Sequence, residues 1–556
     1  MNPQVTIYDT TLRDGTQGTG ISFSTLDKIR VAEKLDEFGV HYIEGGWPGS
    51  NPKDAAFFDE AAKRTWKTAK ITAFGMTRRG KMRVEDDKQV QMLLDANTPA
   101  VTIVGKTWPL HVTEVFQVSL EENLAMIADT VAYLKKHGRE VLYDAEHFFD
   151  SFKEDPEYSL KTVKAAQDAG ADLIVLCETN GGALPEFVGE VTAKVIAHLG
   201  RPVGIHTHND GGVGVANALA AIRAGACQVQ GTINGYGERV GNCNLITVMP
   251  NLQIKMGIDL GVDLTKLRDL AHFVDEMANV PHDIRAPYVG VAAFTHKGGL
   301  HVHAVQKLAR TYEHVDPSLV GNERVITISD MSGQSNVLVR AEALGLKLSK
   351  GDPKVQEILA QVKLNESRGY EYEAAEASFE MLVRRMSNEQ RPFTIVKWHA
   401  NVLRAYEATS HHKEASLTVN RDTGAVLLKD QESSERIERD FEATEATVKL
   451  RVGKKEFYEV ASSEFGPINA MDAALRKALK QAYPDANLDA VRMEDYKVRI
   501  IDSGSGTAAR TRVLVVSSDG QKSWGTVGVG TNIIDASWDA LVDSIEHYLV
   551  RRQMTA

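Results

Sequence analysis

The sequence is poor in cysteine, with three in 556 residues, and no two of them form a CxxC pair. An odd set of thiols without that spacing excludes a disulfide framework and a thiolate zinc site. Long apolar runs are also missing, since no stretch approaches the roughly 20 residues needed to cross a bilayer. No secretory signal follows Met1. We therefore expect a protein of the reducing cytoplasm with no membrane partner.

An excess of positive charge is absent as well. The 75 acidic residues outnumber the 64 basic ones and give a net charge of −11. Proteins that bind nucleic acids or anionic membranes carry the opposite balance, so neither partner is expected. The chain is too long for one hydrophobic core, and we predict roughly three or four structural units.

The first half of the sequence alternates short strand-like segments with longer segments of helical apolar spacing, such as residues 26–38 and 120–136. Eight such β-then-α units in about 270 residues predict an α/β fold of the TIM (β/α)8 type, with a doubly wound open sheet as the alternative. The predicted strands cover residues 5–8, 40–43, 70–74, 101–104, 141–143, 173–176, 203–205 and 229–233.

Reactive polar residues follow nearly every predicted strand, where barrel enzymes place their chemistry. Arg13 and Asp14 follow the first strand, Glu146 the fifth and Thr179 the sixth. Arginine is a permanently charged, planar donor that can clamp a carboxylate or an oxyanion. The simpler alternative for Arg13 and Asp14 is a solvated turn with a surface ion pair.

The seventh strand leads into His206 and His208, which are two residues apart and therefore point to the same face of a strand. Imidazoles with this spacing can share one metal ion. Asp14 could supply a third ligand, and the amide oxygen of Asn242 a fourth. This mixed set of nitrogen and oxygen donors suits Mg, Mn, Co or Zn. A pair of hydrogen-bonded structural histidines is the alternative.

Glycines near these residues invite a dinucleotide-binding interpretation, which their spacing does not support. Neither Gly235 and Gly237 nor Gly211, Gly212 and Gly214 form GxGxxG between a first strand and its helix. An acidic residue about 20 positions later is also required for that fingerprint.

Three motifs resemble those of the DRE-TIM metallolyases and occur in that family's order: DTTLRDGTQ at residues 9–17, HTHND at 206–210 and GYGERVGN at 235–242. The segment FTHKGGLH at residues 294–301 resembles the histidine motif of the acyl-CoA condensing branch, which includes isopropylmalate, homocitrate and citramalate synthases. Within that branch, three segments look most like the citramalate synthases of the isoleucine pathway, namely residues 43–53, 104–111 and 144–150.

This resemblance implies an acyltransferase that condenses acetyl-CoA with pyruvate to give (R)-citramalate and free CoA. It also implies roles for individual residues. These are Asp14, His206, His208 and Asn242 in metal binding, Arg13, Glu146 and Thr179 around the 2-oxo acid, and His301 and Tyr312 as catalytic residues brought from beyond the barrel.

The chemistry requires a base that removes a proton from the thioester methyl group. His301 is the candidate, because a neutral histidine works near pH 7, and Glu146 is the rival. Tyr312 could position the water of the later hydrolysis. Met76 and Val104, at the ends of the third and fourth strands, are expected to line a tight pocket for the methyl group of pyruvate, or else to be ordinary barrel packing.

Two other functions compete with this interpretation. An isopropylmalate synthase would need a larger pocket for 2-oxoisovalerate. An inactive paralogue acting as an amino-acid sensor would not need Arg13, the metal ligands or His301.

We predict three domains: a catalytic barrel at 1–275, helical linker subdomains at 276–390, and a C-terminal α+β domain at 391–556. An internal near-repeat of strands followed by a helix marks the last domain. The resemblance implies that it is regulatory, with isoleucine as feedback ligand in a homodimer; a dimerisation domain without a ligand is the alternative. The charge-rich residues 409–442 predict a mobile excursion.

Overall fold

The computed structural model describes residues 5–346, 348–405, 417–419, 426–428 and 441–555. The chain forms two compact units, one of residues 1–295 with 313–325 and one of residues 296–312 with 326–556. Each unit has hydrophobic cores of its own.

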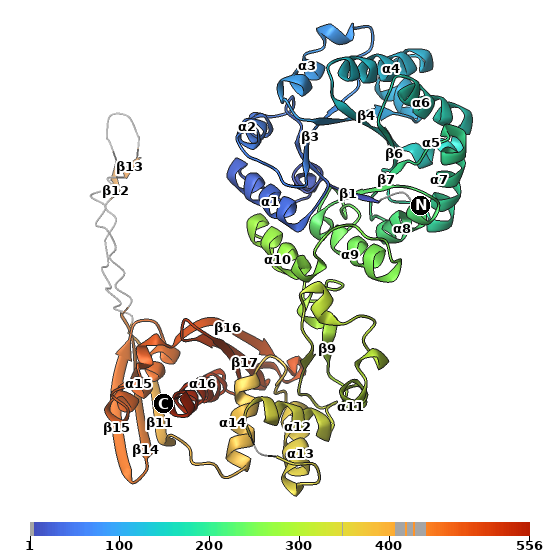
Figure 1. Cartoon of the computed structure of the whole chain (residues 1–556). Helices are drawn as coiled ribbons and strands as arrows, with labels where there is room; N and C mark the ends of the chain where they lie inside the picture. Colours follow the sequence, from blue (N-terminus) through green and yellow to red (C-terminus); the bar gives the residue numbers. More distant parts are fainter. Residues whose placement is uncertain (1–4, 347, 406–416, 420–425, 429–440, 556) are drawn as a thin grey trace. The chain divides into compact units, whose positions relative to one another are not determined.

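Eight parallel strands close into a barrel in the first unit (Figure 1). Each strand pairs with the next along the chain, and β8 pairs with β1 so that Gly231 lies opposite Asp9. This closed order confirms the predicted TIM barrel and excludes the open doubly wound sheet. The strands are β1 (Thr6–Asp9), β2 (Tyr42–Gly46), β3 (Lys70–Met76), β4 (Ala100–Lys106), β5 (Glu140–Glu146), β6 (Leu173–Glu178), β7 (Gly204–Thr207) and β8 (Gln228–Gly231).

Helices surround the barrel and bury their apolar faces against it (Figure 1). The first of them begins with a capping box between Ser24 and Asp27 and ends at Gly39, whose φ of 101° is left-handed. The helices are α1 (Thr25–Phe38), α2 (Pro52–Ala61), α3 (Lys88–Asp95), α4 (Leu120–Lys136), α5 (Phe148–Glu154), α6 (Pro156–Asp168), α7 (Pro185–Leu199), α8 (Gly214–Arg223), α9 (Leu245–Pro250) and α10 (Leu267–Ala278).

The second unit begins with a small helical region. Its core contains Val337, Ile358 and Phe379, all fully buried. The short strand β9 (Thr295–His296) pairs with β10 (Val325–Ile326), and each of these strands begins with the last residue of a first-unit segment and ends with the first residue of a second-unit segment. The helices are α11 (Gly299–Lys307), α12 (Gln334–Ala343), α13 (Pro353–Ser367) and α14 (Glu376–Met386).

The C-terminal part contains two three-stranded antiparallel sheets, each followed by a helix. This arrangement confirms the α+β class with an internal repeat, and it adds a first strand to each repeat. The elements are β11 (Thr394–Ala405), β14 (Phe441–Val452), β15 (Lys455–Ser463) and α15 (Pro467–Ala482), then β16 (Arg492–Ile500), β17 (Thr511–Ser518), β18 (Ser523–Gly530) and α16 (Ile533–Thr555).

Most of the predicted excursion at 409–442 lies outside the described residues. Its described parts include the short strands β12 (Leu417–Val419) and β13 (Val426–Leu428), which pair antiparallel. Among the helices that the structure describes, none combines the length and the apolar character needed to cross a membrane.

Candidate active site

The turn after β1 is held by its own side chains. Asp9 accepts hydrogen bonds from the backbone N–H and the hydroxyl of Thr11, at 3.0 and 2.7 Å. The hydroxyl of Thr10 accepts a bond of 3.2 Å from the N–H of Asp14. These bonds fix the backbone so that Arg13 and Asp14 lie at the carboxyl end of the barrel, where a TIM barrel carries its chemistry.

The guanidinium of Arg13 is held on three sides. Its Nε donates to Glu44, its Nη1 donates to Asp14 at 3.1 Å, and its central carbon lies 3.7 Å from the centre of the Phe74 ring. Burial lowers the pKa of Arg13, but Glu44 and Asp14 offset this effect and raise the pKa above its ordinary value. The side chains of Arg13 and Asp14 are 11% and 6% exposed, which excludes a surface ion pair.

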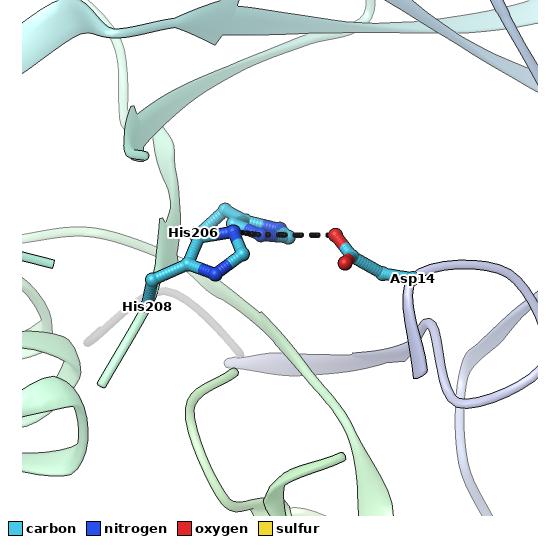
Figure 2. A group of neighbouring side chains, drawn as sticks. All are labelled: Asp14, His206 and His208. Carbon is cyan, nitrogen blue, oxygen red and sulfur yellow. Dashed lines mark hydrogen bonds and ion pairs between the residues drawn. The ribbon is translucent and has the colours of Figure 1, made fainter. Parts of the chain in front are cut away.

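Asp14, His206 and His208 meet at the carboxyl ends of β1 and β7 (Figure 2). Nε2 of His206 lies 3.6 Å from Oδ2 of Asp14 and 3.4 Å from Nε2 of His208. Ligand atoms of the three buried residues all lie within 4.8 Å of one another. The structure therefore brings together three of the four predicted metal ligands around one point.

The hydrogen bonding and the protonation of these donors fit the binding of a divalent cation. Oδ1 of Asp14 and Oδ1 of Asn242 are buried without a hydrogen-bond partner. Burial raises the pKa of Asp14, but Arg13 and the histidines lower it to about 2. Burial, and then the neighbouring His206, lowers the pKa of His208 to about 4. At neutral pH the cluster thus offers a carboxylate and a neutral imidazole, the forms that bind metal ions.

Asn242 reaches the cluster because the loop after β8 folds back onto the end of β7. Its backbone pairs with that of His208, and its Nδ2 donates to the carbonyl of Tyr236 at 3.2 Å. Gly237 has a φ of 148°, and a Cβ there would lie 2.1 Å from Nδ2 of Asn242. The glycine therefore serves the close approach of Asn242 rather than a nucleotide.

Arg239 ties the same loop to two other strand ends. Its Nε and Nη2 donate to the carboxylate of Asp210 at 2.7 and 2.9 Å, and Nη2 also donates to the carbonyl of Thr179 at 2.8 Å. Arg239 belongs to the GYGERVGN motif at residues 235–242. The motif alone does not predict this role, because the role depends on how three loops meet.

The predicted substrate residues Glu146 and Thr179 lie at the ends of β5 and β6. The carboxylate of Glu146 pairs with Lys106 at the end of β4. The hydroxyl of Thr179 accepts a 2.8 Å hydrogen bond from the N–H of His147, whose backbone is left-handed with a φ of 55°. Because this bond uses an oxygen lone pair, the hydroxyl hydrogen is directed elsewhere.

The two residues predicted to line the pocket are neighbours. Met76 and Val104 are register partners at the carboxyl ends of β3 and β4 and are partly buried.

His301 and Tyr312 belong to the second unit. Their rings stack with centroids 4.1 Å apart and an interplanar angle of 26°. His301 is exposed and Tyr312 is 45% exposed, so His301 is not a buried structural histidine.

Comparisons with known proteins account for most of the chain. The HMGL-like family matches residues 4–274, the homocitrate synthase post-HMGL domain-like family 288–369, and the LeuA allosteric (dimerisation) domain 373–549. The (R)-citramalate synthases of Aquifex aeolicus and Geobacter sulfurreducens are both 49% identical to the chain, over 99% and 98% of it and 99% and 97% of their own lengths. The chain belongs to the citramalate synthase family.

Membership in the citramalate synthase family confirms the resemblance found in the motifs. The 2-isopropylmalate synthase of Methanocaldococcus jannaschii is more distant, at 29% identity over 99% of this chain and 96% of its own length. The sequence similarity therefore favours the citramalate synthases over the isopropylmalate synthases of the same branch.

Proposed function

We propose that this chain is an (R)-citramalate synthase of isoleucine biosynthesis, which condenses acetyl-CoA with pyruvate and then hydrolyses the thioester. The observation that carries the proposal is the buried Asp14, His206 and His208 cluster beside the fixed cation of Arg13. It occurs in a chain 49% identical over nearly its whole length to (R)-citramalate synthases.

In this proposal, Asp14, His206, His208 and Asn242 hold a divalent metal. When bound, such an ion polarises the keto group of a 2-oxo acid as a Lewis acid. Its identity stays open among Mg, Mn, Co and Zn, since the donors are of mixed type.

Arg13 supplies a fixed positive charge for the keto oxygen, which becomes an alkoxide when the carbon–carbon bond forms at C2 of pyruvate. A donor already held in place stabilises this charge without reorganising during the reaction. Thr179 donates its hydroxyl hydrogen to the carboxylate of pyruvate, and the Met76 and Val104 pair borders the methyl group.

The proton lost from the acetyl methyl group goes to His301. Glu146, the rival base, is already ion-paired with Lys106, so its carboxylate is occupied. In the second step, water positioned by Tyr312 adds to the thioester carbonyl. The carbon–sulfur bond then breaks; one proton of the water passes to the sulfur, giving CoA as the thiol, and the other leaves the new carboxyl group for solvent. The alkoxide takes up the proton held by His301, so citramalate is released as the hydroxy dicarboxylate.

The C-terminal domain would bind isoleucine as a feedback ligand and pair two copies of the chain. The match to the LeuA allosteric (dimerisation) domain supports an allosteric role and dimerisation, and isoleucine is the proposed ligand because it is the end product of the proposed pathway. The three free thiols, Cys177, Cys227 and Cys243, support a cytoplasmic location, because that compartment keeps thiols reduced.

The test is CoA release from acetyl-CoA with pyruvate, 2-oxobutyrate, 2-oxoisovalerate or 2-oxoglutarate, repeated with isoleucine and with leucine. We expect the highest kcat/KM with pyruvate and inhibition by isoleucine. A preference for 2-oxoisovalerate would instead make the chain an isopropylmalate synthase, and release with none of the acids would indicate an inactive sensor.

A further inference from the structure

Behind the metal cluster, the second ring nitrogen of His206 is hydrogen-bonded inside the barrel. Nδ1 of His206 lies 3.0 Å from Oε1 of Gln230, and Nε2 of Gln230 donates to Oδ1 of Asp144 at 3.1 Å. His206, Gln230 and Asp144 are 5%, 0% and 3% exposed. The three residues therefore form a chain of hydrogen bonds in the barrel interior, with its end at the cluster.

The strand register explains this chain. His206 on β7 and Gln230 on β8 are register partners in the parallel barrel, so their side chains leave neighbouring strands at the same height. Asp144 comes from β5, which is not a neighbour of β8. Gln230 thus connects a residue of the metal cluster with a strand elsewhere in the barrel wall.

The two ends of the Gln230 amide impose a direction on these bonds. When Oε1 faces His206, the imidazole proton must lie on Nδ1, which leaves the lone pair of Nε2 available to a metal. If the amide were turned over, its N–H groups would face Nδ1 and require the proton on Nε2, the atom next to Asp14 and His208. The structure has the first orientation, in which Oδ1 of Asp144 accepts from the amide nitrogen; one oxygen of this carboxyl group can accept whether or not the other carries a proton.

We propose that Gln230 is a positioning residue for the metal centre: held by Asp144, it fixes the tautomer and ring orientation of His206 that leave Nε2 free to bind metal. The inference rests on the proposed metal site and adds a residue to it. A second ring-nitrogen bond of this kind commonly contributes 10–100-fold to metal affinity.

The same strand offers a matched control. Gln228 lies two positions before Gln230 and therefore points to the same face of β8. It is also buried, at 1% exposed, but its Nε2 donates to the hydroxyl of Thr6 at 3.3 Å. Replacing Gln228 removes a buried amide of the same type from the same interior while leaving the Gln230 bond to His206 in place.

The experiment titrates the metal-stripped, full-length protein with MnCl2 and follows free Mn²⁺ by electron paramagnetic resonance. Gln230→Leu should weaken Mn²⁺ binding about 10–100-fold. Gln230→Glu should stay within about threefold of the unsubstituted chain, because one carboxylate oxygen still accepts from Nδ1 and the other can accept from Asp144, whose raised pKa keeps it protonated at neutral pH. Gln228→Leu should leave the affinity unchanged, and thermal melts without metal report the folding of each variant.

Two results would overturn the role of Gln230: Mn²⁺ affinity in Gln230→Leu within about threefold of the parent, or an equal loss in Gln228→Leu. If Gln230→Leu does not fold, Gln230→Glu decides, since a loss above about tenfold there is incompatible with a role for the acceptor oxygen. If the parent chain itself binds no Mn²⁺, the proposed metal site fails and the inference falls with it.

Discussion

At the scale of single residues, the proposed role of Arg13 in catalysis depends on the neighbouring side chains that fix its guanidinium group. Arg13→Lys keeps the charge but loses the planar fork that contacts Glu44 and lies over Phe74. We expect kcat for CoA release to fall about 10²–10³-fold, as when one oxyanion donor is removed. The Mn²⁺ affinity should change less than about threefold, and the exposed Arg30→Lys should behave like the parent. A near-normal kcat would remove Arg13 from the mechanism.

Asp144 gives a second prediction at this scale. Burial, and then the charge of Glu44, raises its pKa from 3.8 to about 8. The folded state therefore holds this proton more tightly, and the stability that the proton contributes is lost as the pH rises towards 8. Asparagine at position 144 stays neutral, so the melting temperature of Asp144→Asn relative to the parent should increase from pH 5 to pH 8. Each kcal/mol of stability that the parent loses over this range corresponds to about 2–4 °C. A constant difference between the metal-free proteins would show that Asp144 does not titrate in this range.

The sequence predicted the positions of the proposed metal ligands but not the side chains that hold them in place. Asp14, His206 and His208 could be predicted because motif position and strand periodicity report which side chains reach the end of a barrel. The roles of Gln230 and Phe74 could not, because they depend on strand register and on atoms that meet across the interior. Asp144 is a polar residue in the barrel interior, and its bond to Gln230 gives the physical reason for its place there.

At the scale of elements, the loop after β8 places Asn242 through the Arg239 contacts with Asp210 and Thr179. Arg239→Ala should loosen this loop, weakening Mn²⁺ binding and raising KM for pyruvate, each by roughly tenfold. Val240→Ala is the matched control, because Val240 is the next residue and is 60% exposed. Equal effects of the two substitutions would mean that the loop does not depend on the Arg239 contacts. Isothermal titration and initial rates measure the two quantities.

Some strands could be predicted from local sequence patterns and others could not. All eight barrel strands were predicted within a few residues, because strands buried on both sides stand out as apolar runs. The strand β16 was missed, since nearly all its residues are exposed and no apolar face alternates along it. Its place in the sheet is set by antiparallel pairing with β17, from Arg492 opposite Ser518 to Ile500 opposite Thr511. Long-range pairing of this kind leaves little trace in a local pattern.

At the scale of the whole molecule, the cluster of Asp14, His206 and His208 lies in the first unit and His301 in the second. His301→Ala should therefore leave Mn²⁺ and pyruvate binding unchanged while kcat falls about 10²–10⁴-fold, the usual contribution of a general base. His303→Ala, exposed on the same helix, should retain activity. A near-normal rate in His301→Ala would exclude it as the base and return the role to Glu146.

The division into two units also predicts how ligands stabilise the protein. A ligand that binds only the folded form stabilises it by about 2.7 kcal/mol at 100 times its Kd. The proposed Mn²⁺ ligands all belong to the first unit, whereas the LeuA domain match at 373–549 lies in the second. In differential scanning calorimetry we therefore expect two transitions, with Mn²⁺ raising the melting temperature of one and isoleucine that of the other. The Gln230→Leu variant should lose the shift caused by Mn²⁺ and keep the shift caused by isoleucine. A single transition that both ligands move equally would show that the two units unfold together, despite their separate cores.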